Sequence, residues 1–258
     1  MLKKLFTPFE YIDKKVLYAV AGFQVLLLAL AWGFLVPEKT FFPRLPEVIH
    51  AWGEMWKNGL FYHLYKTLSL CLTATVISIL FSCIVSYSSV IPFFRPIANF
   101  FTKLRYNPIQ GFTLFLTTAT GGGRNLQITL LVIFMSFYFI TALMSVIDSI
   151  PEEDYYRRKA MKMSRWQILW KVVIKDRADF LIEVIRQNLS ITFMMIVSVE
   201  AMDKSQGGLG ALLVDTNRAL NFPKIFALQL TILFIGILLD TVLKYFFSQF
   251  PANKKRSA

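Results

Sequence analysis

The sequence is poor in the residues from which catalytic and metal sites are usually built. It has two cysteines and two histidines in 258 residues, and 17% of its residues are charged, against about 25% in an ordinary soluble domain. His50 and His63 stand isolated rather than in a cluster with metal-ligand spacing, and no nucleophile–base pairing stands out. We therefore expect no catalytic residues and no metal site in this chain.

Further absences limit the function classes. No Gly-x4-Gly-Lys-Ser/Thr sequence occurs, so the chain lacks a P-loop for ATP, and the glycine-rich Thr120–Arg124 (TGGGR) is predicted to be a turn. Cys71 and Cys83 lie on one predicted helix, about 18 Å apart, which is beyond the reach of a disulfide bond. The N-terminal segment has no small-residue cleavage site after a short apolar run, so we do not expect a removable signal peptide.

Long apolar stretches dominate what is present. Hydrophobic residues make up 55% of the chain, 25 of them are Phe, and the mean hydropathy is +0.52. Because apolar runs of this length indicate membrane spans, we predict an all-α integral membrane protein with about six transmembrane helices, at about 16–36, 67–91, 106–120, 126–146, 181–199 and 223–247. The third is short and contains Asn107, Pro108 and Gly111. Irregular backbone at membrane depth is tolerated where it lines a cavity, so this segment is a candidate wall of a pathway.

The basic residues predict the orientation of the chain. Nineteen of the 28 Lys and Arg fall on the side that would hold both termini, the loop at 92–105 and a charged insert at 149–177. Eight fall on the other side, and Arg186 lies within the fifth span. Because basic residues accumulate on the cytoplasmic side, both termini and the insert are predicted to be cytoplasmic. The same bias accounts for the net charge of +12 without a nucleic-acid partner.

The insert at 149–177 carries two helix-start signals. Ser149–Glu152 and Ser164–Gln167 both have the spacing of a capping box, and they predict two short helices joined by a sharp turn at 162–164. Two interpretations stay open from these residues alone. One is a solvated charged loop or a membrane-surface helix that holds anionic lipid headgroups, and the other is a docking element that presents a corner to a cytoplasmic partner.

The insert and the residues around it resemble the permeases of ATP-binding-cassette (ABC) importers, and most closely the sulfonate/taurine/nitrate/bicarbonate permease family. Met161–Gln167 and Leu169–Lys175 are similar to that family's coupling-loop sequence LGASRWQ…FWRVVLP. Further similar positions follow in the same order: Glu200, Gly208-Leu209-Gly210, Phe226-Ala227, Gly236 and Asp240. Upstream, Arg44–Val48 resembles the family's LPSPSEVW segment, so the resemblance covers about residues 40–247.

With this resemblance the chain divides into four parts. These are a basic cytoplasmic leader at 1–15, the first span with an external interfacial segment at 16–66, a core transmembrane permease domain at 67–248 whose coupling loop occupies 149–180, and a basic cytoplasmic tail at 249–258.

The resemblance implies a permease subunit of a bacterial ABC importer in the plasma (inner) membrane, which forms half of the path of a small solute. The partners it implies are ABC ATPase subunits that carry ATP and Mg, a second permease copy in a homodimer, a periplasmic or lipid-anchored solute-binding protein, and membrane lipid. It implies no cofactor in this chain and no nucleic acid. The alternative is a non-transporting scaffold or regulatory subunit derived from a permease.

Three sets of residues are candidates for the sites of such a protein. The ATPase would dock on Tyr156, Arg157, Arg158, Ala160, Met161, Lys162, Met163, Ser164 and Arg165. The translocation path would be lined by Asn107, Asn188, Thr192, Met195, Ser198 and Glu200, although the small and hydroxyl residues of this helix equally suit helix packing. The binding protein would meet Gly208, Leu209 and Gly210.

Several departures from the family pattern fall in the coupling loop, and two of them are Lys175 and Asp179, which replace prolines. Tyr156-Arg157-Arg158 replaces the family's Glu-Ala-Ala, and Lys162 replaces the loop glycine. Without a glycine, Lys162 must adopt a different turn or accept roughly 1 kcal/mol of backbone strain.

Charged residues within the spans are expected to neutralise one another locally. Glu183 and Arg186 are three residues apart, and Asp240 and Lys244 are four apart. The two members of each pair therefore lie on one helix face, and we predict that they form an ion pair.

Overall fold

The computed structural model describes residues 13–35 and 42–248, and every regular element within them is helical. In these two ranges, four helices are long and apolar enough to cross a membrane: α2 (Lys14–Leu35), α4 (Leu60–Ser88), α7 (Gly123–Asp148) and α12 (Phe222–Ser248). α10 (Ala178–Met202) is a fifth if its two halves, bent by 42° between Leu189 and Ile191, count as one span. The predicted all-α integral membrane class is confirmed.

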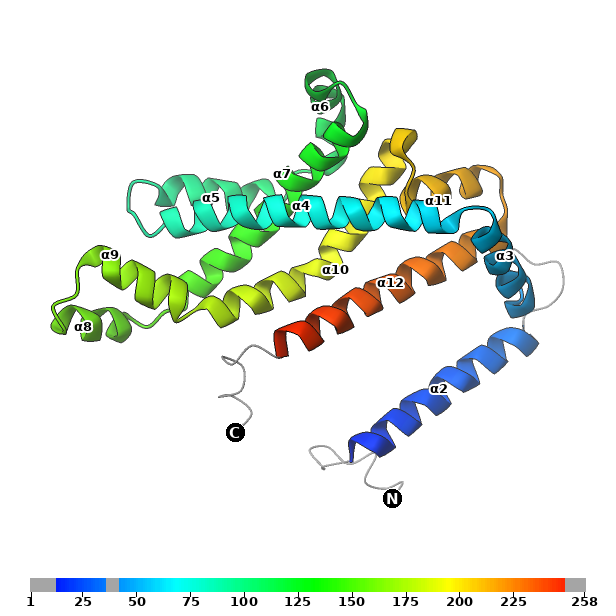
Figure 1. Ribbon diagram of the computed structural model, residues 1–258, viewed down its shortest axis with the longest axis horizontal. Helices are drawn as coiled ribbons and strands as arrows, with labels where there is room; N and C mark the ends of the chain where they lie inside the picture. The colour runs from blue at the N-terminus through cyan, green and yellow to red at the C-terminus, as the bar shows by residue number, and fades with distance from the viewer. Residues whose placement is uncertain (1–12, 36–41, 249–258) are drawn as a thin grey trace. The chain divides into compact units, whose positions relative to one another are not determined.

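The chain divides into two compact units. One holds the residues up to Asn58 together with Thr216–Gln229, and the other holds Gly59–Asp215 and the residues from Leu230 onward. The second unit contains α4, α7, α10 and the short helices between them (Figure 1).

α4 and α7 pack along a seam of small residues, which forms the centre of the second unit. Ala74, Ser78, Ser82 and Ser86 recur every four residues on α4, and all four are fully buried. Side chains of this size let two helices approach closely in a membrane. The Ser82 hydroxyl also donates a hydrogen bond to the backbone oxygen of Ser136 on α7, at 3.3 Å. The seam therefore fixes α4 on α7, and α10 completes the same apolar core.

The expected third span, at about 106–120, is not a single helix, which corrects that prediction. The chain forms α5 (Arg95–Leu104) and, after an irregular stretch, α6 (Thr113–Thr120). The break falls at Asn107 and Pro108 because proline has no N–H and disfavours helical backbone in the residue before it. Pro108 itself is extended, with φ −70° and ψ 133°.

The broken segment nevertheless runs antiparallel to α7, with the 3-10 turn η1 (Ile109–Phe112) between its two helices. Three contacts mark this course in order along α7: Arg95–Asp148 at 2.7 Å, the rings of Phe101 and Phe137 with centres 6.1 Å apart, and those of Phe112 and Phe134 at 5.7 Å. A turn with positive φ at all three glycines of 121–123 then joins α6 to α7, as predicted. The segment therefore runs alongside α7 as two short helices rather than as one long helix.

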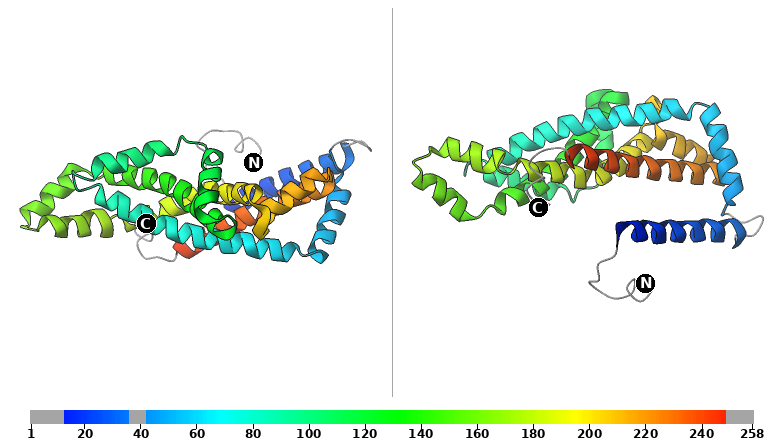
Figure 2. Two further views of the ribbon diagram at one scale, coloured as in Figure 1. Left: turned by 90° about the horizontal axis from the view of Figure 1, so that it is seen from above. Right: turned by 60° about the horizontal axis from the view of Figure 1, so that its bottom comes forward.

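Between α7 and α10 the chain forms a hairpin of short helices. These are α8 (Glu152–Ala160) and α9 (Arg165–Ile168), and a π-helical stretch, η2 (Leu169–Lys175), continues α9. Figures 1 and 2 show α8 and α9 side by side at one end of the second unit. We refer to residues 149–177 as the α8–α9 hairpin.

The capping prediction is confirmed for α9 and wrong for α8. At α9 the Gln167 N–H donates to the Ser164 hydroxyl at 3.3 Å, and the Ser164 N–H donates to the Gln167 side chain at 2.9 Å. At α8 the N-cap is Pro151. Ser149 is the C-cap of α7 and has helical backbone angles, and its hydroxyl donates back to the Val146 oxygen at 2.7 Å. It is therefore committed to α7 and cannot cap α8.

Of the two outcomes predicted for Lys162, a different turn or a strained backbone, the structure shows the strained backbone. Its φ is +56°, in the left-handed region. The Lys162 N–H donates to the Lys159 oxygen at 3.0 Å, and the Met163 N–H donates to the Arg158 oxygen at 3.4 Å. These two bonds form a Schellman motif, in which the left-handed position is usually glycine. Lysine keeps the turn here at a cost of about 1 kcal/mol.

The first unit contains α2, α3 (Leu45–Lys57) and the beginning of α12. Trp52 and Trp56 are exposed on α3 with their rings edge to face, which suits the membrane–water boundary. Glu54 of α3 pairs with Lys224 of α12 at 3.4 Å. The indole N–H of Trp32 on α2 donates to the Pro43 oxygen at 3.0 Å.

Replacing Ser164 by alanine tests the cap that starts α9. We expect Ser164→Ala to destabilise the start of α9 by about 1 kcal/mol, because the Gln167 N–H loses its acceptor. Hydrogen exchange of amides 165–169 should then be about fivefold faster. Ser149→Ala is the matched control, since its hydroxyl bonds only to α7, and it should leave this exchange unchanged. Equal exchange in the Ser164→Ala protein and the wild type would contradict the capping assignment.

Candidate functional site

The α8–α9 hairpin is fixed to the ends of two long helices by a small apolar core. Ile150, Val172 and Val173 are buried, and they pack with Tyr87 and Val90 at the end of α4. A residue from the last turn of α7 joins the same cluster. The position of the hairpin is therefore coupled to the positions of α4 and α7.

Ion pairs close the hairpin on itself. Arg158 of α8 donates to Asp176 at 2.9 Å, and Arg177 donates to Asp154 of α8 at 3.5 Å. Both pairs join α8 to the segment that follows η2. The guanidinium of Arg158, predicted as a docking residue, is thus engaged within the hairpin.

Most of the predicted docking residues face outward. Of the nine, seven are exposed, and Arg158 and Met163 are half-buried. Tyr156 and Met161 are both 65% exposed. Burial raises the pKa of the neighbouring Tyr155 above its usual value, so that hydroxyl stays protonated. The hairpin therefore presents an aromatic, apolar and basic corner.

Toward the other end of α7, a buried carboxylate holds the loop with the predicted Gly208-Leu209-Gly210 motif. Glu200 is 1% exposed, and one of its oxygens accepts hydrogen bonds from the Thr67 hydroxyl at 2.9 Å and the Gly210 N–H at 3.0 Å. The Thr67 hydroxyl oxygen accepts the Leu209 N–H at 2.9 Å. We call Thr67, Glu200 and residues 208–210 the carboxylate clamp. It joins α4, α10 and the start of α11 (Leu209–Arg218).

The glycines of the clamp are required by close packing. Gly208 has a φ of +115°, and a Cβ added there would lie 2.2 Å from the Glu200 carboxyl carbon. A Cβ at Gly210 would lie 2.0 Å from the backbone oxygen of Val197. Neither position leaves room for a side chain, so the motif has a structural role around Glu200.

Two residues of this region escaped the sequence reasoning. The ring Nδ1 of His63 lies 3.2 Å from the Gly208 nitrogen and can accept its N–H. The amide of Gln127, fully buried on α7, donates to the Asp203 oxygen at 2.8 Å. The sequence alone shows His63 as an isolated histidine before the predicted span at 67–91, whereas α4 begins at Leu60 and includes it. The signal available was its spacing of four residues from Thr67, which places both on one helix face.

The six candidate path residues do not share one surface. Their environments differ, with Thr192 and Glu200 buried, Met195 and Asn188 half-buried, and Ser198 and Asn107 exposed. Asn188 donates to the Val184 oxygen at 2.8 Å, and Ser198 to the Met194 oxygen at 3.0 Å, so both satisfy their own helix. The buried members fit the packing alternative, and a lining role stays a prediction for the exposed ones.

Arg186 joins α10 to α12. It pairs with Glu183 at 2.7 Å, as predicted, and with Asp240 of α12 at 3.3 Å. Asp240 therefore pairs with Arg186, and the prediction that it pairs with Lys244 is wrong. The reason is that α12 turns this carboxylate toward α10, and a fork-shaped guanidinium can bond two carboxylates at once.

These features define a helical membrane protein whose bundle carries a charged hairpin at one end of α7 and a clamped glycine loop toward the other. A family model described as the binding-protein-dependent transport system inner membrane component matches residues 74–250. Because the match covers more than half of the chain, the protein belongs to this family of ABC transporter permease components. It is a multi-pass inner-membrane transport subunit and not an enzyme, which confirms the resemblance seen in the sequence. No curated relative matches the chain.

Two variants of Glu200 separate its geometry from its charge. Glu200→Ala leaves the Gly210 N–H and the Thr67 hydroxyl without their acceptor, and each buried unpaired group costs about 1–3 kcal/mol. We therefore expect a clearly lower midpoint of thermal unfolding in detergent. Glu200→Gln keeps an acceptor oxygen and should retain most of the wild-type midpoint. Equal losses in both variants would show that the charge, rather than the hydrogen-bond geometry, holds the clamp.

A glycine substitution tests the close packing of the clamp. Gly208→Ala must accommodate a left-handed φ and a clash with the Glu200 carboxyl group, so we expect a loss of about 3 kcal/mol or more. Gly111→Ala is the matched control, because nothing lies within 4 Å of a Cβ added there. Its midpoint of thermal unfolding should equal that of the wild type. A Gly208→Ala protein as stable as the control would contradict the packing argument.

Proposed function

We propose that this chain is the permease subunit of a bacterial ABC importer for a small solute, and that the α8–α9 hairpin couples it to a separate ATPase. One observation carries the proposal. The hairpin has a fixed shape, since a Schellman motif ends α8 and a capping box starts α9, while its corner is exposed and its base packs on the ends of α4 and α7. A rigid corner on a fixed base can pass a displacement to the bundle.

The proposed orientation places the hairpin and both termini in the cytoplasm. Six crossings, counting the broken α5–α6 segment and the bent α10, return the chain to its starting side. The excess of Lys and Arg on that side supports this orientation. The carboxylate clamp then lies toward the external end of α7, where a solute-binding protein, periplasmic or lipid-anchored, would meet the turn at 208–210.

The proposed path lies between two copies of the chain. The exposed face of α10 carries Gln187, Met194 and Ser198, whose spacing places them along one side of the helix. A second copy would cover this face and complete the pathway. ATP and Mg would be held by the ATPase partner, and this chain would supply no cofactor.

Charge reversal at neighbouring arginines tests the docking role. Arg157 is exposed and lies outside the ion pairs of the hairpin. We expect Arg157→Glu to lower ATP hydrolysis stimulated by the loaded binding protein at least tenfold in proteoliposomes, with the midpoint of thermal unfolding unchanged. Unchanged stimulation would contradict docking at this residue.

The Arg158–Asp176 pair provides a control within the same hairpin. Arg158→Glu breaks that pair, and we expect faster hydrogen exchange across α8 and η2. The loss of local stability should be less than about 1 kcal/mol, because the pair is partly exposed. The double change Arg158→Glu with Asp176→Arg should restore the slow exchange. Failure of the double change to restore it would show that Arg158 does not act through Asp176.

Co-purification distinguishes the importer from the scaffold alternative. When the chain is extracted from its native membrane in mild detergent, the importer predicts ATPase subunits in a fixed ratio to the permease. A preparation with no ATPase would favour a non-transporting scaffold.

A further inference from the structure

A cavity of about 660 Å³ lies between the α8–α9 hairpin and the loop that follows α4. Its apolar walls include Val90, Ile91 and Pro92 from the loop, and Ile168 and Leu169 from the hairpin. A cavity of this size accommodates a small amphiphilic molecule. Val90, Tyr155 and Ile168 line the cavity and also pack against the apolar core of the hairpin, so the cavity adjoins that core.

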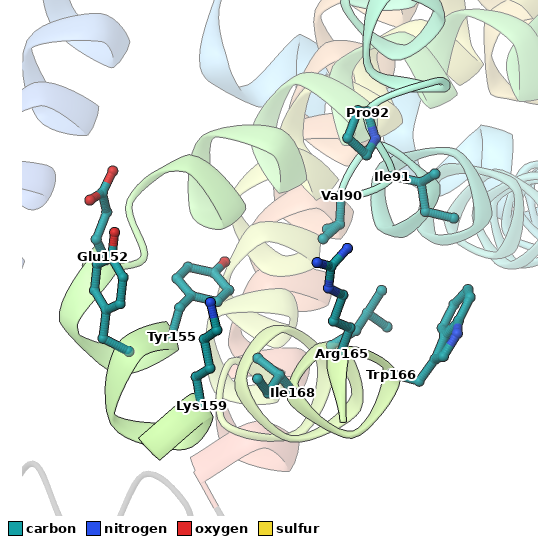
Figure 3. Close-up of a pocket in the computed structure, with 11 residues that line it drawn as sticks. Val90, Ile91, Pro92, Glu152, Tyr155, Lys159, Arg165, Trp166 and Ile168 are labelled. Carbon is teal, nitrogen blue, oxygen red and sulfur yellow. The ribbon is translucent and has the colours of Figure 1, made fainter. Parts of the chain in front are cut away.

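Basic and hydroxyl side chains line the cavity on its hairpin side, and they are Lys159, Arg165, Tyr155 and Tyr156. Figure 3 shows the guanidinium of Arg165 beside Val90, and the amino group of Lys159 beside Tyr155. In the described part of the chain neither cation forms an ion pair. Glu152 also lines the cavity, but it lies apart from both cations with its carboxylate directed away (Figure 3). Two cations and two hydroxyl donors on apolar walls fit an anionic headgroup joined to an apolar body.

Two features of the cavity suit a position at the boundary between the membrane and water. Its loop wall directly follows the end of α4, one of the long apolar helices. Large exposed aromatic side chains surround it, with Phe93 75% and Trp166 70% exposed. Aromatic side chains gather at the headgroup level of a bilayer, and basic pockets at this level bind anionic lipid headgroups.

We propose that this cavity binds one anionic phospholipid, with its phosphate on Lys159 and Arg165 and the start of its acyl chains against Val90–Pro92. The bound lipid joins the end of α4 to the hairpin and so helps to fix the angle at which the hairpin leaves the bundle. This inference rests on the membrane location that the family establishes. The cavity shares Tyr156 and Arg165 with the predicted docking surface, so its test is made without the ATPase.

Lipid retention by the purified chain tests the proposal without any ATPase present. Native mass spectrometry would compare phosphatidylglycerol with phosphatidylcholine, each added to the delipidated protein in detergent. We expect one phosphatidylglycerol per chain and at least tenfold weaker retention of phosphatidylcholine. Retention of phosphatidylglycerol by the double variant Lys159→Gln with Arg165→Gln should be at least tenfold weaker than by the wild type. Lys171→Gln with Lys175→Gln, which removes two exposed charges from the same hairpin outside the cavity, should retain it as the wild type does.

Three outcomes would overturn the proposal. Equal retention of the two lipids, or equal loss in the cavity and control variants, would show that the cavity does not select an anionic lipid. Displacement of phosphatidylglycerol by millimolar inorganic phosphate would assign the cations to a free anion. Displacement by the co-purified ATPase would assign the cavity to a protein segment. None of these results bears on whether the permease transports a solute.

Discussion

The close approach of α4 to α7 is the contact on which the rest of the second unit depends. In lipid, apolar side chains gain little by moving from one apolar environment to another, so helices associate through close van der Waals packing and hydrogen bonds. The buried row from Ala74 to Ser86 permits that packing. One end of the row positions Tyr87 for the core beneath the hairpin, and the other positions Thr67 for the carboxylate clamp. Both candidate sites thus rest on one helix pair.

The sequence predicted those features that depend on near neighbours along the chain. The apolar runs, the α9 capping box and the Glu183–Arg186 pair all lie within a few helical turns, and the structure contains them. The clamp could not be predicted in the same way, because Thr67 and Glu200 are 133 residues apart and meet only through packing. The prediction that Ser149 caps α8 was wrong for a related reason. Ser149 lies between two helices, and its backbone forms the C-cap of α7.

The departures from the family pattern in the coupling loop have separate physical meanings. Lys162 retains the left-handed turn that glycine usually supplies, because bonds on both sides determine it: the Schellman motif before it and the Ser164 cap after it. Arg158 bonds within the hairpin, whereas Tyr156 and Arg157 face outward. The sequence change is therefore partly internal to the hairpin and partly on the surface that a partner would contact.

The bend in α10 gives that helix two mechanical parts. The half before the bend is tied to α12 by Arg186 and Asp240, and the half after it is tied to α11 by Glu200 and Gly210. A straight helix would turn as one rod and force both attachments to rotate together. Because the bend lies between the two attachments, each half of α10 can move with the helix that it contacts. A rotation that starts at the hairpin would therefore reach the glycine loop only to the extent that the bend resists deformation.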